Sequence, residues 1–244
     1  AESRRRSLPR GCGRMKRLVL FDIDGTLLTA GGAGRRAVTD ALTAVFGQTG
    51  PVGSYSFAGR TDPQIVTELL ASAGMAKADV EARLPEFWDA YLANLQREIG
   101  RADVHPLPGV PALLDRIEAE GGDVVLGLLT GNVQAGARIK VQAAGIGFDR
   151  FLVGAFGSDH ADRPELPAVA AERAKKRTGV EFAGKEIVII GDTPFDIACG
   201  EHLGVRTIAV ATGVHSLDDL AACGPDYLFD DLSDTAAVWG AIAG

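Results

Sequence analysis

Two acidic segments, each directly after an apolar run, contain the residues of this sequence best suited to chemistry. Asp22 and Asp24 follow the first run, and Asp192 and Asp196 follow a later one. Carboxylates packed together repel one another, and a hard divalent cation such as Mg²⁺ is the usual compensation. If the two apolar runs are neighbouring strands, the pattern predicts one acidic site at their ends.

Each segment alone has a simpler explanation. A lone Asp-x-Asp is common in turns, and residues 191–196 could form a helix N-cap with an acidic first turn. Their joint occurrence favours a site, because both segments directly follow strand-like runs, and Gly25 and Gly191 allow close approach of the backbone.

The elements that must position these residues are predicted from the apolar pattern. Nearly continuous Val/Ile/Leu runs are typical of strands buried on both faces. The runs lie at 18–21, 124–129, 151–156, 187–190, 205–210 and 227–229. Helical stretches between most of them lie at 111–120, 133–144, 164–176 and 195–203. The sequence therefore predicts an α/β fold, a Rossmann-like parallel sheet core with helices on both faces.

About a hundred residues separate the first two predicted strands, far more than one crossover needs. Helical patterns within this interval lie at 36–46, 63–73 and 80–99. We therefore predict an inserted α-helical cap at 30–103 and a catalytic core formed by 15–29 and 104–244. A cap over the carboxyl ends of a parallel sheet lies where such folds bind ligands.

Composition and charge exclude several classes of protein. Of 244 residues, 46% are hydrophobic and 23% are charged, which is typical of a globular chain. No apolar run approaches the roughly 18 residues of a membrane span. The net charge is −7, and residues 1–14 contribute +4, which leaves −11 for the rest. We expect 1–14 to be a disordered basic extension, and the acidic body argues against a nucleic-acid partner.

The cysteines and histidines indicate neither a disulfide framework nor a second metal site. Cys12, Cys199 and Cys223 are an odd, scattered set, which favours a reducing cytoplasm. The four histidines lie outside the predicted cap and are interpreted as surface or structural residues: His105, His160, His202 and His215. Both a monomer and a homodimer stay open.

The acidic segments match the motifs of a known family in order and spacing. The sequence resembles the haloacid dehalogenase-like (HAD-like) hydrolases, specifically the phosphatases with a helical cap between their first and second motifs, such as phosphoglycolate phosphatases. The first motif, Asp-x-Asp-Gly-Thr, lies at 22–26. The second, a strand ending in Thr, lies at 128–132, and the fourth, Gly-Asp-x-x-x-Asp, lies at 191–196. The resemblance covers 15–244.

The third motif departs from the family pattern. The family usually has Lys before Pro, and this chain has Arg163 there. Arg keeps the charge and adds a planar fork suited to phosphate oxygens, so we interpret Arg163 as the functional counterpart. The alternative is a surface Arg163 paired with Asp159 or Asp162. In that case Lys140 or Lys175 would reach the site instead.

The resemblance implies a two-step phosphoryl transfer to water. Asp22 would attack the phosphorus and form an aspartyl-phosphate, and Asp24 would protonate the leaving alcohol and then deprotonate water. Mg²⁺ would be held by the Asp22 carboxylate, the Asp24 backbone carbonyl and Asp192. Asp196 would order these ligands. The implied substrate is a small phosphomonoester similar to phosphoglycolate.

Substrate binding is implied for the second motif and for the cap. Thr130 and the backbone amides of Gly131 and Asn132 would donate to phosphoryl oxygens, and the cation of the third motif would balance their charge. In the cap, Asp62 is well placed as a helix N-cap, which would leave Arg60 free to reach a second anionic group. The alternative for Arg60 is a solvated loop arginine.

Other functions of the same fold stay open as alternatives. A dehalogenase dispenses with the metal, which the full acidic set argues against. A phosphonate-cleaving relative needs a cap Lys, yet no Lys lies between Lys16 and Lys77. A sugar-phosphate mutase is the second enzyme hypothesis, although similar mutases use a cap His that the predicted cap lacks. A phosphate- or metal-binding regulatory module without turnover is the hypothesis from a different class.

Overall fold

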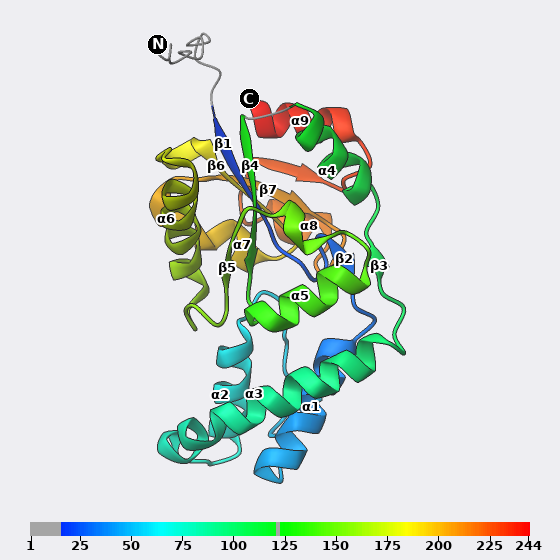
Figure 1. Ribbon diagram of the computed structural model, residues 1–244, viewed down its shortest axis with the longest axis vertical. Helices are drawn as coiled ribbons and strands as arrows, with labels where there is room; N and C mark the ends of the chain where they lie inside the picture. Colours follow the sequence, from blue (N-terminus) through cyan, green and yellow to red (C-terminus); the bar gives the residue numbers. More distant parts are fainter. Residues whose placement is uncertain (1–15, 121–122) are drawn as a thin grey trace, which may run out of the picture.

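Six parallel strands form the central sheet of the computed structural model, which describes residues 16–120 and 123–244 (Figure 1). They are β1 (Arg17–Phe21), β4 (Val124–Thr130), β5 (Val153–Phe156), β6 (Ile187–Gly191), β7 (Arg206–Val210) and β8 (Tyr227–Phe229). Their order is β5-β4-β1-β6-β7-β8, so β1 pairs with both β4 and β6. The predicted parallel sheet is confirmed. The predicted basic extension at 1–14 lies outside the described residues.

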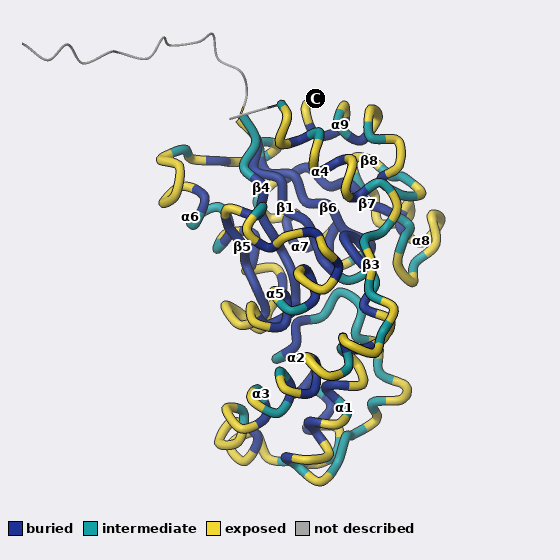
Figure 2. The backbone as a smooth tube through the Cα atoms, turned by 45° about the vertical axis from the view of Figure 1, so that its right-hand side comes forward, coloured by how far each residue is buried: buried dark blue, intermediate teal, exposed yellow. Residues whose placement is uncertain are grey.

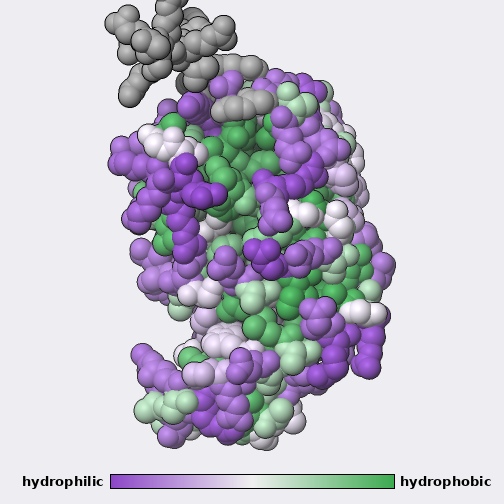
Figure 3. Space-filling view, viewed as in Figure 1, coloured by the Kyte–Doolittle hydropathy of each residue, from purple (hydrophilic) through white to green (hydrophobic). Residues whose placement is uncertain are grey.

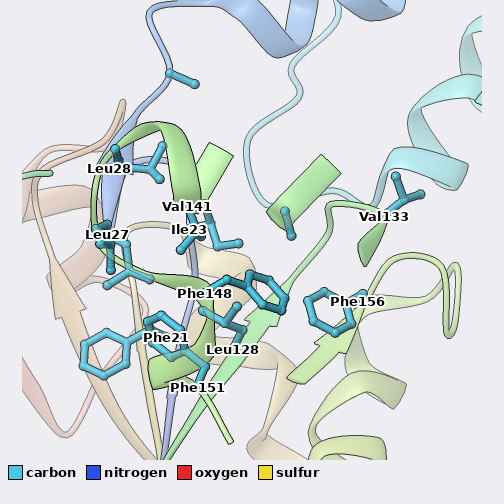
Figure 4. Packing of buried hydrophobic residues seen from close by; sticks show 14 of the residues in the cluster. Phe21, Ile23, Leu27, Leu28, Leu128, Val133, Val141, Phe148, Phe151 and Phe156 are labelled. Atoms are coloured by element: carbon cyan, nitrogen blue, oxygen red, sulfur yellow. The ribbon is translucent and has the colours of Figure 1, made fainter. Parts of the chain in front are cut away.

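Helices cover both faces of this sheet. They are α4 (Val110–Ala119), α5 (Gln134–Ala143), α6 (Leu166–Thr178), α7 (Pro194–Cys199), α8 (Leu217–Ala221) and α9 (Thr235–Ala243). Successive side chains of a strand point to opposite faces. Phe21 of β1 therefore belongs to one apolar cluster with residues of α4, α5 and α9, whereas Leu20 belongs to another with residues of α6. Figure 4 shows Phe21, Leu128 and Val141 in the first of these clusters, and Figure 2 shows the strands as buried segments.

Three further helices form a separate unit beyond one end of the sheet (Figure 1). They are α1 (Ala33–Phe46), α2 (Asp62–Ser72) and α3 (Lys77–Ile99). We call residues 30–103 the insertion and the other described residues the core. The interior of the insertion contains Leu42, Leu69 and Phe87, none of them exposed. The inserted helices are present as predicted, while the domain boundaries and the role of a cap stay predictions.

A small antiparallel pair of strands joins the insertion to the core. β2 (Leu28–Thr29) pairs with β3 (His105–Pro106) where the chain enters and leaves the insertion. Strands of two residues have no periodicity, so the sequence predicted only a loop at the entry. The pairing means that the two connections are tied to each other at the base of the insertion.

The insertion also packs directly on the core. α3 lies against α5, and a Cβ added at Gly136 of α5 would lie 3.3 Å from the hydroxyl of Tyr91. One apolar cluster continues from the insertion into the core, and Figure 3 shows apolar side chains at the narrow level where the two parts meet. This contact places the insertion over the carboxyl ends of the strands, at the end of the molecule opposite the C-terminus (Figure 1).

Candidate active site

The carboxyl ends of β1, β4 and β6 lie at the edge of the sheet that faces the insertion. Between the two parts lies a cavity of about 440 Å³, and residues of both parts line it. Asp22 follows β1, Thr130 ends β4 and Asp192 follows β6, and all three line the cavity. The backbone N–H of Asp22 donates to the carbonyl of Ile190 at 2.9 Å. This bond ties the first acidic segment to β6.

Three carboxylates come together at this edge of the sheet. Oxygens of Asp22, Asp192 and Asp196 lie within 4.8 Å of one another, and all three residues are buried. Thr26 donates to Asp192 at 2.9 Å. The hydroxyl of Thr193 donates to Asp196 at 2.7 Å, within the N-cap of α7. The structure therefore brings together three of the four predicted acidic residues through their side chains.

Gly25 makes room for this cluster. Its φ of +85° is a conformation that favours glycine, and an added Cβ would lie 2.4 Å from Oδ2 of Asp192. A Cβ at Gly191 would lie 2.1 Å from Cγ of Asp196. The backbone around both acidic motifs is thus packed directly against the carboxylates.

Arg163 is buried in the same cluster, with 4% of its surface exposed. Its Nη2 lies 3.1 Å from Asp22 and also donates to Asp196. Its Nε is buried and has no hydrogen-bond acceptor within the described residues. A surface position for Arg163 is therefore wrong. The competing lysine of α6, Lys175, is exposed and pairs with Glu181.

The electrostatics of the cluster fit a cation. Burial raises the pKa of Asp22 to about 7, with Arg163 opposing the rise. Burial, followed by the charges of Asp196 and Asp22, raises the pKa of Asp192 well above its usual range. Among the described residues, one guanidinium thus contacts a group of three buried carboxylates. The raised pKa values show that ionising these acids together is unfavourable without a compensating charge, and their all-oxygen donors suit a hard divalent cation.

The loop after β4 forms the neighbouring wall of the cavity. The hydroxyl of Thr130 accepts hydrogen bonds from the backbone N–H of Asn132 at 3.3 Å and from its Nδ2 at 2.8 Å. Gly131 lies against the insertion, because an added Cβ would lie 2.0 Å from the carbonyl oxygen of Arg60. All three residues predicted to bind phosphate therefore line the cavity beside Asp22.

Lys140 is a second buried cation, which the sequence suggested only as a substitute for Arg163. Its Nζ donates to Asp24 at 2.7 Å and to Oδ1 of Asn132 at 2.6 Å, and 5% of its surface is exposed. It lies on the buried stripe of α5 with Gly136 and Ala137. A lysine at helical spacing among small buried residues was the available signal. The Asp24 side chain thus faces Lys140, outside the cluster of three carboxylates.

Arg60 lines the cavity but is not free. It pairs with Glu68 at 2.9 Å, and its guanidinium lies over the rings of Tyr55 and Phe195. The prediction that Asp62 is the N-cap of α2 is wrong. Thr61 is the cap, because its hydroxyl accepts from the backbone N–H of Gln64 at 3.2 Å.

Arg35 is a further cation of the cavity wall, from the first turn of α1. It donates to the carbonyls of Val52 at 2.7 Å and Tyr55 at 3.0 Å and stacks on Phe57. Within the described residues it forms no ion pair, unlike Arg60, whose charge Glu68 already balances.

The remaining predictions concern residues away from the cavity. None of the four histidines lines it. Cys199 and Cys223 are free thiols, and Cys12 lies outside the described residues. Within 16–120 and 123–244, no helix has the length and apolar character needed to cross a membrane.

Comparisons with known proteins found similar sequences among hydrolases and phosphatases. A family model described as HAD-hydrolase-like matches residues 164–235. The chain is 27% identical to a phosphoglycolate phosphatase of Rhodospirillum rubrum over 90% of this chain and 89% of that protein. It is 28% identical to the probable phosphatase IndB of Dickeya dadantii, over 90% of this chain and 92% of that protein.

Solved structures show the same fold. A hydrolase from Pseudomonas syringae superposes with a TM-score of 0.69 at 18% identity, over 94% of this chain and 100% of that chain. CbbY from Rhodobacter sphaeroides, solved in complex with phosphate, superposes with a TM-score of 0.63 at 19% identity, over 90% of this chain and 96% of that chain. The fold, the family-model match and the sequence matches together support the HAD-like hydrolase superfamily, and the chain is similar to its phosphoglycolate phosphatase-like branch.

Proposed function

We propose that this hydrolase is a Mg²⁺-dependent phosphatase that cleaves a small phosphomonoester through an aspartyl-phosphate. The observation that carries the proposal is the position of Asp22. Its carboxylate lies in the cavity between Arg163, at 3.1 Å, and the two further acids Asp192 and Asp196. The full-length similarity to phosphatases supports the same reaction.

The reaction has two displacements at phosphorus. In the first, an oxygen of Asp22 bonds to phosphorus as the bond to the leaving oxygen breaks, and Asp24 gives its proton to that oxygen. In the second, Asp24 takes a proton from water, the water oxygen bonds to phosphorus, and the bond to Asp22 breaks. The products are the alcohol and inorganic phosphate, and both acids return to their starting states.

The metal would be held by the carboxylates of Asp22 and Asp192 and by the backbone carbonyl of Asp24. Asp196 would orient this set through Arg163, with which it pairs. When bound, Mg²⁺ supplies positive charge that reduces the repulsion between the anionic nucleophile and the anionic phosphate.

Donors for the phosphoryl oxygens surround Asp22. Thr130, the backbone amides of Gly131 and Asn132, and the guanidinium of Arg163 line the same cavity. The buried Nε–H of Arg163 has no acceptor among the described residues, and a phosphoryl oxygen would satisfy it. Such donors stabilise charge that develops on the oxygens during transfer.

Lys140 and Asn132 hold the proposed acid/base. Both donate to Asp24, at 2.7 Å and 2.8 Å respectively. The insertion would act as a cap that closes the cavity over the substrate. A small acid such as phosphoglycolate fits best with the full-length relatives. The reducing cytoplasm stays the predicted location.

The decisive test is release of phosphate from p-nitrophenyl phosphate and from a panel of phosphorylated acids, sugars and nucleotides. We expect turnover with Mg²⁺, loss of turnover with EDTA, and recovery when Mg²⁺ is added back. Asp22→Asn should lower kcat by orders of magnitude while the far-UV circular dichroism stays unchanged. Full activity of Asp22→Asn, or of metal-free enzyme, would refute the mechanism.

A further inference from the structure

Asp62 is a buried carboxylate that the proposed reaction does not use. It is the first residue of α2 in the insertion, and 8% of its surface is exposed. Its Oδ2 accepts from the backbone N–H of Val133, a residue of the core, at 2.8 Å. The hydroxyl of Tyr91, from α3 of the insertion, lies 3.4 Å from the same oxygen. The carboxylate of Asp62 thus forms a direct hydrogen bond between the insertion and the core.

Asp62 is bound to the core through its backbone as well. Its N–H donates to the carbonyl of Gly131 at 2.7 Å. Asp62 therefore makes two hydrogen bonds to residues 131–133, one to the Gly131 carbonyl and one from the Val133 N–H, and we call this pair of bonds the bracket. These residues directly follow Thr130. The close approach of Gly131 to Arg60 keeps the two backbones in contact. The loop that would bind phosphate is therefore held from the insertion.

Neighbouring residues extend this contact on the other side of the site. The hydroxyl of Thr61 donates to the carbonyl of Ala161 at 2.6 Å. Arg163 donates to the carbonyl of Gly59 at 3.3 Å. Residues 59–62 of the insertion therefore contact both the loop after β4 and the segment that carries Arg163.

Val133 needs an acceptor from outside its own helix. It is the N-cap residue of α5, and a backbone N–H at the start of a helix has no acceptor within that helix. Val133 is 8% exposed, and a buried N–H without an acceptor costs about 1–3 kcal/mol. Among the described residues, Asp62 of the insertion is the acceptor for this N–H, and none of the core residues accepts from it. The same helix carries Lys140 to Asp24, so the position of its first turn affects both the phosphate loop and the acid/base.

We infer that Asp62 is a positioning residue of the active site. Its carboxylate fixes the phosphate-binding loop 130–133 and the start of α5, so the insertion completes the site in addition to covering it. The bracket formed by the Gly131 carbonyl and the Val133 N–H carries this inference. It rests on the proposed phosphatase activity, which assigns the loop to phosphate.

The experiment compares four variants. Asp62→Ala removes the acceptor, and Asp62→Asn keeps an oxygen that can accept from Val133. Val133→Pro removes the donor instead, and its φ of −63° already matches proline. The fourth is the double variant Asp62→Ala/Val133→Pro. Asp40→Asn, which alters an exposed carboxylate of α1, is the matched control for charge on the insertion.

We expect kcat of Asp62→Ala to fall at least about tenfold, which corresponds to about 1.4 kcal/mol of lost transition-state stabilisation. Inorganic phosphate should bind more weakly by a similar factor. Asp62→Asn should recover most of both losses. Val133→Pro should lose as much as Asp62→Ala, and the double variant should lose little more than either single variant, because both remove one bond.

Three results would overturn the inference. The first is that kcat and phosphate affinity of Asp62→Ala stay within twofold of the wild type. The second is that Asp62→Asn recovers neither quantity. The third is that the losses of kcat in the two single variants add fully in the double variant. If Asp62→Ala does not fold, Val133→Pro alone provides the test: a tenfold loss of kcat supports the inference, and an unchanged kcat overturns it. If the wild type hydrolyses no phosphomonoester, the proposed function fails. Phosphate affinity and amide exchange of Val133 then still test the positioning role.

Discussion

Arg163 lies where the family resemblance predicts a lysine, and its contacts show what an arginine does at this position. The guanidinium lies 3.1 Å from Asp22 and also pairs with Asp196. It donates to the carbonyl of Gly59 in the insertion as well. A planar fork can serve several partners at once, which the point charge of a lysine does less well.

Replacing Arg163 should therefore weaken catalysis strongly. Charge-assisted hydrogen bonds contribute about 1.5–3 kcal/mol, so Arg163→Ala should lower kcat/KM at least about tenfold. Arg163→Lys should keep a measurable part of the activity, because the charge survives. Arg177→Ala, on the exposed face of α6, is the control and should match the wild type. Near-normal kinetics of Arg163→Ala with collapse of Lys140→Ala would show that Lys140 carries the third-motif role.

Some site residues could be found from sequence and others could not, for a physical reason. Asp22 and Asp192 follow buried strands directly, so the sheet alone determines where they lie. Lys140 and Asp62 depend on partners 116 and 71 positions away, Asp24 and Val133 respectively. Such contacts depend on how α5 and α2 pack, and no local pattern encodes that packing.

The buried charge of Asp62 should make stability depend on pH. Burial raises its pKa to about 6, opposed by Lys140 and by the bond from Val133, with Asp24 adding to the rise. In the unfolded chain the pKa is about 4. The folded state therefore binds this proton more tightly. The contribution of Asp62 to stability is complete below about pH 4 and is lost as pH rises through about 6.

Asp62→Asn removes this titration while keeping an acceptor for Val133. Its Tm should match the wild type near pH 4.5 more closely than at pH 8, where the variant should melt several degrees higher. One kcal/mol corresponds to about 2–4 °C in a chain of this size. Thermal melts at the two pH values measure the difference. If the difference in Tm between Asp62→Asn and the wild type is the same at the two pH values, Asp62 is not a buried group that becomes ionised between them.

At the scale of elements, the long strands and helices were predictable and the connections were not. The five longer strands are nearly continuous apolar runs, and such runs can be recognised in the sequence without knowing how the strands pack. β2 and β3 contain two residues each, and they exist because the chain crosses between insertion and core twice at one place. The cap of α2 is Thr61, whose hydroxyl accepts from Gln64, whereas the carboxylate of Asp62 accepts from Val133 of the core.

The start of α1 is the element that we expect to select the substrate. Its first turn has no acidic residue and no side-chain cap, and Gly32, Gly34 and Arg35 line the cavity there. Arg35 has no carboxylate partner among the described residues, so a second anionic group of the substrate would find an uncompensated charge. Arg60, already paired with Glu68, offers less.

Arg35→Ala should raise KM for phosphorylated acids several-fold and leave p-nitrophenyl phosphate nearly unchanged. Remote binding energy helps only substrates that carry the remote group. Arg36→Ala is the matched control, because Arg36 is adjacent, exposed and paired with Glu98. Steady-state kinetics on both substrates give the comparison. If KM rises equally for the two substrates, the role of Arg35 is instead to hold the loop through the carbonyls of Val52 and Tyr55.

At the scale of the whole molecule, the acidic cluster should lower the free energy of unfolding when no metal is bound. Asp22 and Asp192 are buried, and burial raises the pKa of each. Parallel strands bring them together, and residues of the insertion line the same cavity, so both parts contribute to the site. The whole fold should therefore respond to an ion that neutralises the cluster.

If Mg²⁺ binds the folded state as proposed, and not the unfolded one, it should stabilise the entire chain. At a concentration of 100 times Kd the gain is about 2.7 kcal/mol, or roughly 5–11 °C in Tm for a chain of this size. Asp192→Asn should lose this response, and its Tm without metal should equal or exceed that of the wild type, since one buried carboxylate is gone. Melts with NaCl at matched ionic strength separate binding from screening. An equal rise in Tm with NaCl, or an undiminished Mg²⁺ response in Asp192→Asn, would place the ion elsewhere.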